Sequence, residues 1–486
     1  MPDQDEVIAF LAQGSEARAE THISIVFLHA DTAYKLKRAV RFSYLDYSAP
    51  ARRKAFCEAE LALNRRTAPQ LYRRVRAITR AASGGLEFDG PGEAVDYVLE
   101  MRRFAEADVF DSLAKAGKLT AQLLRDLTDN IAAFHQAAER TPRDGAALLR
   151  GVVEGNAENL AKAGFDPMLV EQVNTACRAA VEAHAPLLAA RGAGIRRCHG
   201  DLHLGNIVLW QGQPLLFDCI EFCDDFACID PLYDLAFLLM DLLHRAEADF
   251  AALVFNRYLD RTAEAEGMAA MPLFIAVRAV IRAHVLAAQG RAEEGRTYLA
   301  LAAEVLRPAT PLLLAIGGVS GSGKSTLAAA VAPEFAPVPG ARVLRTDVLR
   351  KTLCGVAPET RLSESAYTPQ MSARVYAEMH KQAAAALAAG YSVILDAAFL
   401  RQDEREAASA LAARLGVDFT GFWLDAPDEV LIARLDARRG DASDAGAAVL
   451  RRQRELETGE ISWTRIYAAQ PKAAQHDAVM KSLARG

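Results

Sequence analysis

The sequence predicts two domains, a mixed α+β domain followed by an α/β domain built on a parallel sheet. A chain of 486 residues exceeds what one hydrophobic core usually serves, because domains hold about 100–200 residues. The front part shows a hairpin pattern and then long Ala- and Leu-rich helical stretches. Behind the Pro-Ala-Thr-Pro segment at 308–311, short apolar runs alternate with helical segments. That alternation is typical of a parallel sheet covered by helices.

The elements of the front part follow from its hydrophobic periodicity. Residues 22–28 are β-branched and apolar, a polar turn follows, and Tyr34 and Leu36 then alternate with lysines, which predicts a hairpin. Helical spacing of apolar residues predicts the helices. In chain order we expect strands at 22–28 and 32–37, a helix at 51–66, a strand at 96–101, helices over 106–190, strands at 207–210 and 214–217, and helices over 231–306.

Apolar runs of the second part each precede a helical segment, as the strands of a parallel sheet do. The prolines at 308–311 cannot donate backbone hydrogen bonds and favour extended neighbours. We therefore place a linker there, with domains at 1–308 and 309–486. The runs expected as strands are 312–316, 342–344, 392–395 and 419–424.

The composition indicates a soluble protein of the cytoplasm. Hydrophobic residues make up 51% and charged residues 24%, which excludes a disordered or collagen-like chain. Seven cysteines, an odd number, do not fit a secreted disulfide scaffold. The start of the chain is acidic, unlike a signal peptide, and no apolar run approaches about 18 residues, so we expect no membrane helix. The net charge of −6, with −7 before residue 309 and +1 after it, disfavours a nucleic-acid partner.

The strongest motif is Gly-Val-Ser-Gly-Ser-Gly-Lys-Ser at 318–325, which fits GxxxxGK[ST] between a strand-like run and a helical segment. Glycines there let backbone N–H groups surround phosphate oxygens, Lys324 would reach the β- and γ-phosphates of ATP, and Ser325 would bind Mg²⁺. The residues expected at this nucleotide site are Gly318, Gly321, Ser322, Gly323, Lys324, Ser325 and Thr326.

Charged residues after the later strands complete this expected site. Asp347 follows the second strand and can accept a hydroxyl proton, and Arg350, one turn on, can hold an anionic group. Asp396 ends an apolar run, the usual position of a Mg²⁺-orienting carboxylate. Arg434 and Arg438 precede a small polar loop, as in a lid that neutralises the transferred phosphoryl group. The alternative for such arginines is a solvated helix face.

From 309 to 486 the chain resembles the P-loop small-molecule kinases grouped as AAA_33-type predicted kinases. The resemblance rests on residues 318–326, Asp347 with Arg350, Asp396 and the arginine-rich lid. The Asp-x-x-Arg spacing also resembles polynucleotide 5′-hydroxyl kinases, in which the Asp is the acceptor base and the Arg holds a neighbouring phosphate. Zeta-toxin-like kinases share similar parts. The resemblance therefore implies a kinase and leaves its acceptor open.

A second constellation lies in the front part, where residues 199–206 fit H-x-D-x-x-x-x-N and Asp218 follows a short apolar run. In the protein-kinase arrangement the first Asp positions the acceptor hydroxyl, while the Asn and the second Asp bind Mg²⁺. Asp201, Asn206 and Asp218 are therefore the expected catalytic residues of this part, with Asn206 and Asp218 as the metal ligands.

A phosphate-binding lysine and a helical glutamate are expected upstream. Residues 33–35, Ala-Tyr-Lys, resemble the V-A-I-K strand of kinases, so we assign the α/β-phosphate lysine to Lys35. Lys37 points to the same side of the strand and stays a close alternative. We expect Glu60 to orient the lysine, with Glu58 as its competitor.

Residues 20–305 resemble the aminoglycoside phosphotransferase family within the protein-kinase-like fold, on the residues just named. No G-x-G-x-x-G covers the hairpin, the D-F-G position is Asp-Cys-Ile and there is no activation segment, so a protein substrate is disfavoured. The whole order resembles bacterial bifunctional aminoglycoside phosphotransferase/ATP-binding fusion proteins. It implies an α+β protein-kinase-like domain followed by an α/β P-loop kinase domain, and it does not imply antibiotic resistance.

Three features near Asp218 have structural as well as functional interpretations. Cysteines at 219, 223 and 228 lack a paired C-x₂-C knuckle, so we prefer buried free thiols to a zinc site. Acidic residues at 221–225 favour a cationic acceptor such as an amino sugar if they line the acceptor pocket, and otherwise form a solvated turn. Asp230 and Asp234 are expected to cap and brace the following helix.

Together these motifs predict an ATP- and Mg²⁺-dependent phosphotransferase with two separate ATP sites and small-molecule hydroxyl acceptors. In one alternative a single domain is catalytic and the other is a nucleotide-dependent sensing module. In another the P-loop domain is a polynucleotide 5′-hydroxyl kinase-like enzyme. The acceptor-side residues Asp201 and Asp347 favour an enzyme, because a sensor needs only the phosphate and Mg²⁺ groups. No membrane partner is expected, and neither the acceptors nor the oligomeric state is predicted.

Overall fold

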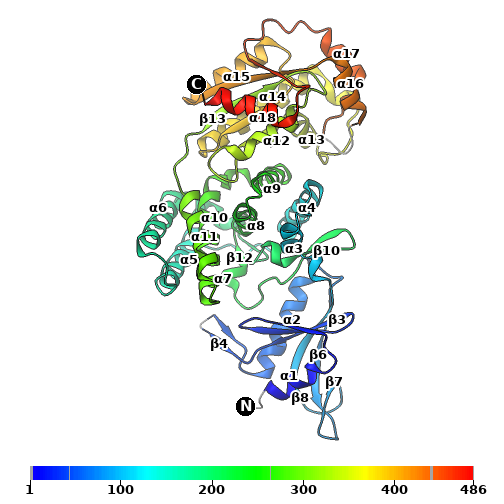
Figure 1. Cartoon of the computed structure of the whole chain (residues 1–486), viewed down its shortest axis with the longest axis vertical. Helices are drawn as coiled ribbons and strands as arrows, with labels where there is room; N and C mark the ends of the chain where they lie inside the picture. Colours follow the sequence, from blue (N-terminus) through cyan, green and yellow to red (C-terminus); the bar gives the residue numbers. More distant parts are fainter. Residues whose placement is uncertain (1–3, 43, 263, 438–441, 485–486) are drawn as a thin grey trace. The chain divides into compact units, whose positions relative to one another are not determined.

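The computed structural model describes the chain except residues 1–3, 43, 263, 438–441 and 485–486. Contacts between residues divide it into two compact units. Figure 1 labels the helices and strands along the chain. The first unit comprises residues 1–152 and 185–241, and the second comprises 153–184 and 242–486. The second unit therefore includes helices that precede the prolines at 308–311, and the domain boundary that we place at those prolines stays a prediction.

A six-stranded antiparallel sheet forms the first part of the first unit, in the order β1-β2-β3-β8-β6-β7. The expected hairpin is confirmed, because β2 pairs with β3 and sets Ser24 opposite Lys37 and Leu28 opposite Ala33. Helix α2 packs on β6 and β8. The elements are α1 (Gln4–Ala12), β1 (Ala17–Glu20), β2 (Ser24–Leu28), β3 (Thr32–Lys37), α2 (Pro50–Asn64), β6 (Tyr72–Arg80), β7 (Leu86–Phe88) and β8 (Ala94–Arg102).

The two faces of this sheet carry different apolar clusters, because neighbouring residues of a strand point to opposite sides. Val98 belongs to the cluster that includes Phe27, and Leu99 belongs to the cluster that includes Tyr72. Lys35 lies directly opposite Leu99 in the pairing of β3 with β8 and therefore shares its face. The strand period thus places Lys35 on the same side as α2.

The loop that carries Asp201 lies in the rest of the first unit. The expected hairpin of β10 and β11 is confirmed, with Ile207 opposite Leu216. A short hairpin of β4 and β5 is an addition that the sequence pattern did not predict. The elements are β4 (Arg41–Phe42), β5 (Leu45–Asp46), α3 (Phe110–Lys115), α4 (Ala121–Ala137), α5 (Gly145–Leu160), α6 (Pro167–Arg191), β9 (Arg196–Arg197), β10 (Ile207–Trp210), β11 (Gln213–Leu216), α7 (Asp224–Ala227), β12 (Cys228–Ile229) and α8 (Pro231–His244), of which α5, α6 and α8 cross the division between the units.

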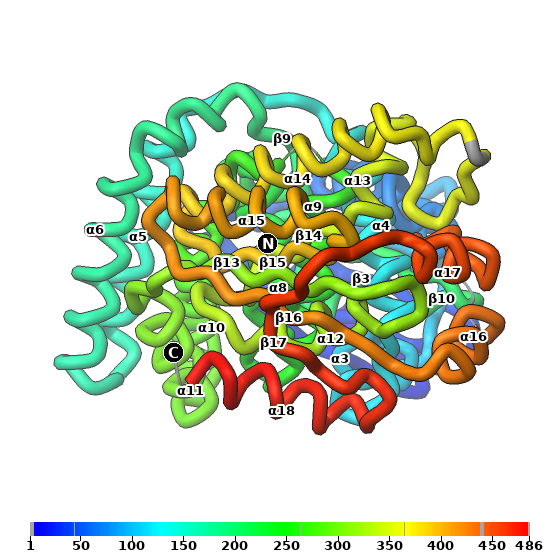
Figure 2. The backbone as a smooth tube through the Cα atoms, turned by 90° about the horizontal axis from the view of Figure 1, so that it is seen from above, coloured from blue at the N-terminus to red at the C-terminus, as the bar shows by residue number. Residues whose placement is uncertain are grey.

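Five parallel strands form the sheet of the second unit, in the order β14-β15-β13-β16-β17. The four expected strands are confirmed, and β17 is an additional edge strand. Helices α12 and α18 cover one face and α14 and α15 the other (Figure 2). The elements are β13 (Leu312–Gly317), α12 (Lys324–Val331), β14 (Arg342–Arg345), α13 (Thr346–Leu353), α14 (Pro369–Ala388), β15 (Val393–Asp396), α15 (Gln402–Leu415), β16 (Asp418–Asp425), α16 (Asp428–Ala437), α17 (Ala447–Arg454), β17 (Thr464–Tyr467) and α18 (Lys472–Leu483).

Helix α9 (Ala248–Arg261) covers the outer edge of β14 within this unit. The side chain of Asn256 accepts the N–H of Val343 at 2.8 Å and donates to the carbonyl of Ala341 at 3.1 Å. Beside it, Arg342 pairs with Asp260 and is only 4% exposed. The helix therefore satisfies backbone groups that an edge strand otherwise leaves to solvent.

Helices α10 (Met271–Ala288) and α11 (Ala292–Val305) pack against each other in the second unit. The segment 265–288 is long and apolar enough to cross a membrane by length and composition, which the lengths of the apolar runs did not predict. In the structure 67% of its most apolar window is buried. Such burial is typical of a helix that packs inside a protein core.

Candidate active sites

Two lysines of β3 share one buried glutamate of α2. Lys35 and Lys37 lie two residues apart and point to the same side of the strand. Lys35 Nζ donates to Glu60 Oε1 at 2.8 Å, and Lys37 Nζ donates to Glu60 Oε2 at 2.7 Å. Glu60 is fully buried, whereas Glu58 is exposed and pairs with Lys54. The structure therefore brings Glu60, and not Glu58, to the lysines.

The segment after β11 brings two carboxylates to the same lysines. Asp218 pairs with Lys35 at 2.5 Å, and Glu221 pairs with Lys37. Asp218 has a φ of 66°, which is uncommon outside Gly, Asn and Asp, and its N–H donates to the hydroxyl of Tyr72 at 3.0 Å. Lys35 is thus the lysine that contacts the expected Mg²⁺ ligand, while Lys37 contacts a residue with no expected catalytic role.

Mutual pairing decides the charge of these side chains. Burial alone disfavours the charged form of Lys35, but Asp218 and Glu60 outweigh it and hold the pKa of Lys35 well above its ordinary value. Glu221 and Glu60 do the same for the pKa of Lys37. Burial by itself would raise the pKa of Glu60, yet the two lysines lower it to about 2. Both lysines and Glu60 are therefore charged at neutral pH.

Asp201 and Asn206 are joined in the loop that precedes β10. Asn206 Nδ2 donates to the backbone oxygen and to Oδ2 of Asp201, each at 2.9 Å. Buried His199 accepts the N–H of Asp201 on Nδ1 at 3.3 Å, and Nε2 of the same ring is hydrogen-bonded to the carbonyl of Phe217 at 2.9 Å. These bonds hold the loop of Asp201 beside the segment that begins at Asp218.

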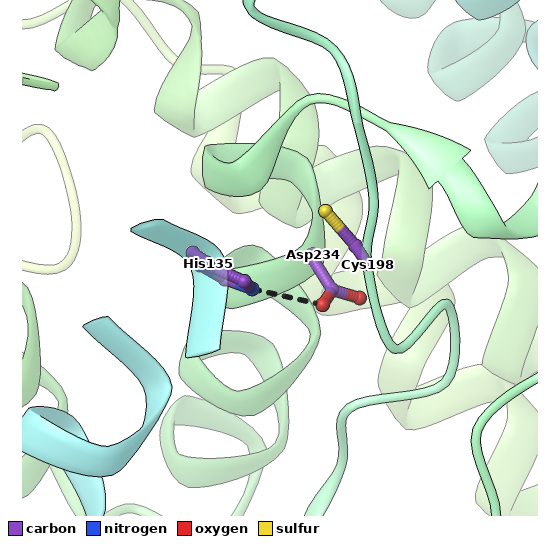
Figure 3. A group of neighbouring side chains, drawn as sticks. All are labelled: His135, Cys198 and Asp234. Atoms are coloured by element: carbon purple, nitrogen blue, oxygen red, sulfur yellow. Dashed lines mark hydrogen bonds and ion pairs between the residues drawn. The ribbon is translucent and has the colours of Figure 1, made fainter. Parts of the chain in front are cut away.

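Asp234 of helix α8 anchors the same loop (Figure 3). Its Oδ2 accepts the N–H of His199 at 3.0 Å, and its Oδ1 accepts the N–H of Gly200 at 2.9 Å. His135 Nε2 also lies 3.0 Å from Oδ2. The expectation that Asp234 braces its own helix stays a prediction, while these bonds show that its carboxylate holds the loop. Asp230 does cap α8, accepting a backbone N–H of the first turn at 2.8 Å.

Figure 3 also draws the one group of three potential metal ligands among the described residues, His135, Cys198 and Asp234, whose ligand atoms lie within 4.8 Å of one another. Asp234 accepts backbone hydrogen bonds on both oxygens, and the thiol of Cys198 donates to the carbonyl of Ile229 at 3.5 Å. Two of the three potential ligands are therefore engaged with backbone groups. We therefore interpret the group as a loop anchor. The cysteines at 219, 223 and 228 are free thiols.

The acidic residues after Asp218 are paired within the chain. Each carboxylate has a cationic partner, so the cluster provides no argument for a cationic acceptor. The pairs are Glu221 with Lys37, Asp224 with Arg197, and Asp225 with Arg143.

The phosphate-binding motif lies where expected, between the end of β13 and the start of α12. Gly318 and Gly321 have φ values of 139° and 85°, and a Cβ atom would stand 2.4 Å from the carbonyl of Leu424 and 2.8 Å from that of Leu431. Only glycine fits both positions. Ser322 is buried, and among the described residues its hydroxyl has no hydrogen-bond partner. An unpartnered hydroxyl inside a glycine-rich loop fits a phosphate-binding site.

The start of α12 carries the remaining residues of the motif. Gly323 caps the helix in a left-handed conformation with φ 94°. Lys324 Nζ donates to the carbonyl of Val319 at 3.0 Å and so folds back over the loop. Thr326 is exposed. Lys324 is therefore close to the expected phosphates, and no contact of Thr326 marks it as part of the site in the described structure.

Asp396 ends β15 next to this loop and is buried. The nearby hydroxyl of Ser325 helps to lower the pKa of this carboxyl group, and Arg345 Nε lies 3.3 Å from its Oδ2. Burial raises the pKa of Asp396, because Arg345 and Lys324 offset it only in part. A hydroxyl beside a carboxylate is an oxygen donor set that hard cations accept. Ser325 and Asp396 therefore fit the expected Mg²⁺ site.

The residues expected on the acceptor side lie on α13. Asp347 is half-buried in its first turn, and Arg350, one turn on, is 7% exposed. Arg350 donates to the carbonyl of Ala366 at 2.9 Å and to the hydroxyl of Ser372 at 3.3 Å, and it lies 4.9 Å from the ring centre of Tyr367. Arg350 thus anchors the segment before α14, and its expected hold on an anionic group stays a prediction.

A polar network beside Arg350 was missed in the sequence. The hydroxyl of Tyr367 donates to Asp444 at 2.6 Å, and Lys351 Nζ lies 3.3 Å from the same carboxylate. Burial opposes ionisation of Asp444, but the hydrogen bond from Tyr367 and the charge of Lys351 help to lower its pKa. No local pattern could mark this network, because Lys351 and Asp444 are 93 residues apart.

Helices α16 and α17 both contact the phosphate-binding loop. Arg434 donates to the carbonyl of Ala468 at 2.8 Å, and its Nη1 lies 3.5 Å from a carbonyl of the loop. Gln453 of α17 accepts the N–H of Ser320 at 2.8 Å. Arg438, the second arginine expected in a lid, lies outside the described residues.

A hollow of about 280 Å³ opens at the loop after β16, lined by Asp425, Ala426, Pro427, Asp428, Arg454 and Tyr467.

Family models match both parts of the chain. Residues 27–274, slightly more than half of the chain, match the model described as the phosphotransferase enzyme family. The chain belongs to this family. Residues 313–457 of the phosphotransferase match the model of an AAA domain, AAA_33. The protein therefore carries two kinase-type domains, and the predicted fold class, a kinase-like α+β domain followed by a P-loop α/β domain, is confirmed.

Relatives share this whole arrangement. Uncharacterized proteins of Mycobacterium tuberculosis and Mycobacterium bovis are 31% identical to the phosphotransferase over 476 residues, which cover 93% of this chain and 92% of theirs.

Solved structures resemble single parts of the phosphotransferase. A gluconokinase from Sinorhizobium meliloti is 24% identical and covers 37% of this chain and 94% of its own, with a TM-score of 0.26. A choline/ethanolamine kinase family protein from Mesorhizobium loti is 15% identical and covers 62% of this chain and 99% of its own, with a TM-score of 0.34. TM-scores this low add nothing to the functional assignment.

Two loop anchors of the phosphotransferase had a sequence signal that we did not use. Asp234 and Asp241 are the acidic residues of the otherwise apolar stretch 232–243, and their spacing puts them on one face of a helix. Buried carboxylates need hydrogen-bond donors. Asp241 finds one in the N–H of Leu204, at 3.1 Å. Charged residues inside an apolar helix therefore indicate a buried polar contact, which here is the contact with the loop that they hold.

Proposed function

We propose that the protein is an ATP- and Mg²⁺-dependent kinase that phosphorylates hydroxyl groups of small molecules, with a separate ATP site in each unit. One observation carries the proposal for the first unit. Asp201, bonded to Asn206, lies beside the segment of Asp218, which itself pairs with Lys35. An acceptor carboxylate, oxygen donors for a cation and a phosphate-binding lysine therefore lie together.

The side chains of the first site fit ATP and Mg²⁺. Lys35 is 13% and Asp218 42% exposed, so both can be reached by a ligand. The two side-chain hydrogen bonds of Asn206 to Asp201 use Nδ2, and its amide oxygen and the carboxylate of Asp218 are donors that Mg²⁺ accepts. When bound, Mg²⁺ would neutralise charge on the phosphates. Lys35 would bind the phosphates in place of Asp218.

Asp201 would act on the acceptor. Its side chain is 38% exposed, and the hydrogen bond from Asn206 fixes the orientation of its carboxylate. The acceptor hydroxyl would donate to Asp201, which takes up the proton as the new oxygen–phosphorus bond forms, while the bond between the γ-phosphorus and the bridging oxygen breaks and ADP leaves. General bases of this kind contribute roughly 10²- to 10⁴-fold in rate.

The P-loop site would supply the corresponding groups from its own residues. Lys324 would bind the β- and γ-phosphates, Ser325 and Asp396 would hold Mg²⁺, and Asp347 would accept the hydroxyl proton. Lys324 already lies over the loop, and the hydroxyl of Ser325 is near enough to Asp396 to lower the pKa of that carboxyl group. Each unit holds side chains that can bind phosphates, side chains that can bind Mg²⁺ and a carboxylate that can accept the hydroxyl proton. We therefore propose that each unit binds its own nucleotide.

Nucleotide counting on the full chain tests the two-site proposal. Calorimetric titration with ATP and Mg²⁺ should find two nucleotides per wild-type chain and one in Lys324→Ala, which removes the phosphate charge of the second site only. A wild-type chain that binds a single nucleotide, unaffected by Lys324→Ala, would overturn the second site.

Incubation of a metabolite extract with ATP and the purified protein tests the reaction. Mass spectrometry should find small molecules that gain a phosphate, with different products lost in Asp201→Ala and in Lys324→Ala. ATP binding without any phosphorylated product would favour a sensing module. Efficient labelling of a 5′-hydroxyl oligonucleotide would overturn the small-molecule acceptor at the P-loop site.

We also propose a cytoplasmic location. All seven cysteines are free thiols, as is usual in a reducing compartment. Fractionation of cells, with immunodetection of the protein in the soluble cytoplasmic fraction, tests this location.

A further inference from the structure

Five charged side chains at the first ATP site form an open chain of four ion pairs, and the backbone between residues 218 and 221 closes this chain into a ring. Lys35 contacts Asp218 and one oxygen of Glu60, while Lys37 contacts Glu221 and the other oxygen of Glu60. The two lysines are two residues apart on one strand, and the two outer carboxylates are three residues apart in one segment. Two ion pairs thereby join strand β3 to helix α2, and two more join β3 to the segment after β11.

The two halves of the ring differ in burial. Side-chain exposure is 2% for Lys37 and 5% for Glu221, against 13% for Lys35 and 42% for Asp218. Tyr47 closes the buried half, since its hydroxyl accepts from Lys37 at 3.3 Å and donates to Glu221 at 2.6 Å. A ligand therefore meets Lys35 and Asp218 and cannot reach the other pair.

We propose that Lys37 and Glu221 are positioning residues of this site: they hold Glu60 and the 218–221 segment in place while Lys35 and Asp218 separate to bind ATP and Mg²⁺. The inference rests on the proposed kinase function. Lys35 cannot pair with Asp218 and with a phosphate at once. The ion pair between Lys35 and Asp218 is therefore broken when the nucleotide binds. The contact of Lys37 with Glu221 needs no such exchange and keeps the segment on β3.

Charge also requires the second lysine. The ring holds two cations and three carboxylates, and Glu60 and Glu221 are both almost fully buried. Without Lys37, Glu221 would lose its cation, and Glu60 would depend on Lys35 alone. A buried carboxylate that loses its partner is strongly disfavoured. The 218–221 segment would then move away from β3, and Asp218 would lose its place beside the phosphates.

The test measures ATP affinity with and without Mg²⁺ in the full chain carrying Lys324→Ala, which leaves only the first site to titrate. Lys37→Met and Glu221→Gln should each weaken the binding of ATP with Mg²⁺ by about 10- to 100-fold, as loss of a supporting partner does at metal sites. They should also reduce the gain in affinity that Mg²⁺ provides, because Asp218 is misplaced. Glu58→Gln, an exposed carboxylate on the same helix, is the matched control and should change neither value.

The outcomes separate this inference from the proposed function. Absence of ATP binding in the Lys324→Ala chain itself would contradict the function. Normal binding there, with an unchanged Mg²⁺ effect in both ring variants, would overturn the positioning role. A purely structural role would lower the melting temperature and leave the Mg²⁺ effect intact in the folded protein. If Lys37→Met does not fold, the near-isosteric Glu221→Gln decides alone.

Discussion

Arg342 of β14 and Asp260 of α9 form a largely buried ion pair, with 2.5 Å between Nη2 and Oδ1. Together with Asn256, which bonds the backbone on either side of Arg342, this pair fastens α9 to the edge of the P-loop sheet. Helix and sheet belong to one compact unit. We therefore expect them to unfold together.

Asp260→Asn should lower the melting temperature of the second unit. Removing one partner of a buried ion pair costs about 3–5 kcal/mol, and Asp260, at 17% exposure, should lie at the lower end. Thermal unfolding with and without ATP, in chains with and without Lys324→Ala, identifies the transition of the P-loop sheet as the one whose rise with ATP depends on Lys324, because a ligand raises the transition of the unit that binds it. Asp249→Asn, exposed on the same helix, is the control. Equal melting temperatures for the two variants would contradict a role for the pair.

Asp347→Asn should abolish phosphoryl transfer by the P-loop site and leave ATP binding nearly intact. The amide cannot take the hydroxyl proton, and a loss of roughly 10²- to 10⁴-fold is expected for such a base. Transfer is measured in the Asp201→Ala background, so that only this site contributes. Asp418→Asn, an exposed carboxylate at the start of β16, should have no effect. Full transfer activity in Asp347→Asn would show that another group is the base.

Gly321→Ala should weaken nucleotide binding at the P-loop by tenfold or more. The new Cβ would stand 2.8 Å from the carbonyl of Leu431, so the loop must move. Gly390→Ala is a close control, since Gly390 has a φ of 86° against 85° for Gly321 but nothing within 4 Å of a Cβ. It should lose about 1–2 kcal/mol of stability through backbone strain alone and keep its ATP affinity. Equal affinities in the two variants would show that the close approach is unimportant.

Glu60 should make the first unit sensitive to acid. Its pKa is lowered from 4.5 to about 2 in the folded chain, because Lys35 and Lys37 outweigh burial. A lowered folded-state pKa means that the ionised group stabilises the fold above its ordinary pKa, and that this contribution is lost as the pH falls from about 4.5 toward 2. Urea unfolding at pH 6 and pH 3 should therefore show a stability gap between wild type and Glu60→Gln that narrows on acidification. A gap of constant size would contradict the assigned pKa.

Local patterns were enough to predict the elements that position both sites. Strand alternation predicted the hairpin that carries Lys35, and a glycine-rich motif between a strand and a helix predicted the P-loop. Edge strand β17 was missed because only Ile466 of its four residues is buried, which leaves little alternation to detect. The two-residue period of a strand could not decide whether Lys35 or Lys37 binds the phosphates, because both point to the same side. The structure brings both lysines to Glu60.

Partners from distant segments could not be predicted. Glu221 pairs with Lys37 across 184 residues, and Asp234 bonds the N–H of His199 across 35. Such pairs depend on which loops the fold brings together, and a single sequence carries no local trace of that. The cationic acceptor inferred from acidic residues was weakened for the same reason, since their arginine and lysine partners lie far away in the chain.

The hydrogen bonds of Asn256 to β14 restrict how genes of this kind can be shortened or recombined. A fragment that begins just after the prolines at 308–311 encodes the P-loop sheet without α9, so the outer edge of β14 is bare. Bare strand edges recruit other chains, and such a fragment should self-associate, whereas one that begins at residue 242 keeps the helix. Asp260 and Arg342 must likewise be inherited together although 82 residues separate them. A crossover in the linker between distant relatives would therefore pair an edge strand with a helix selected for another partner.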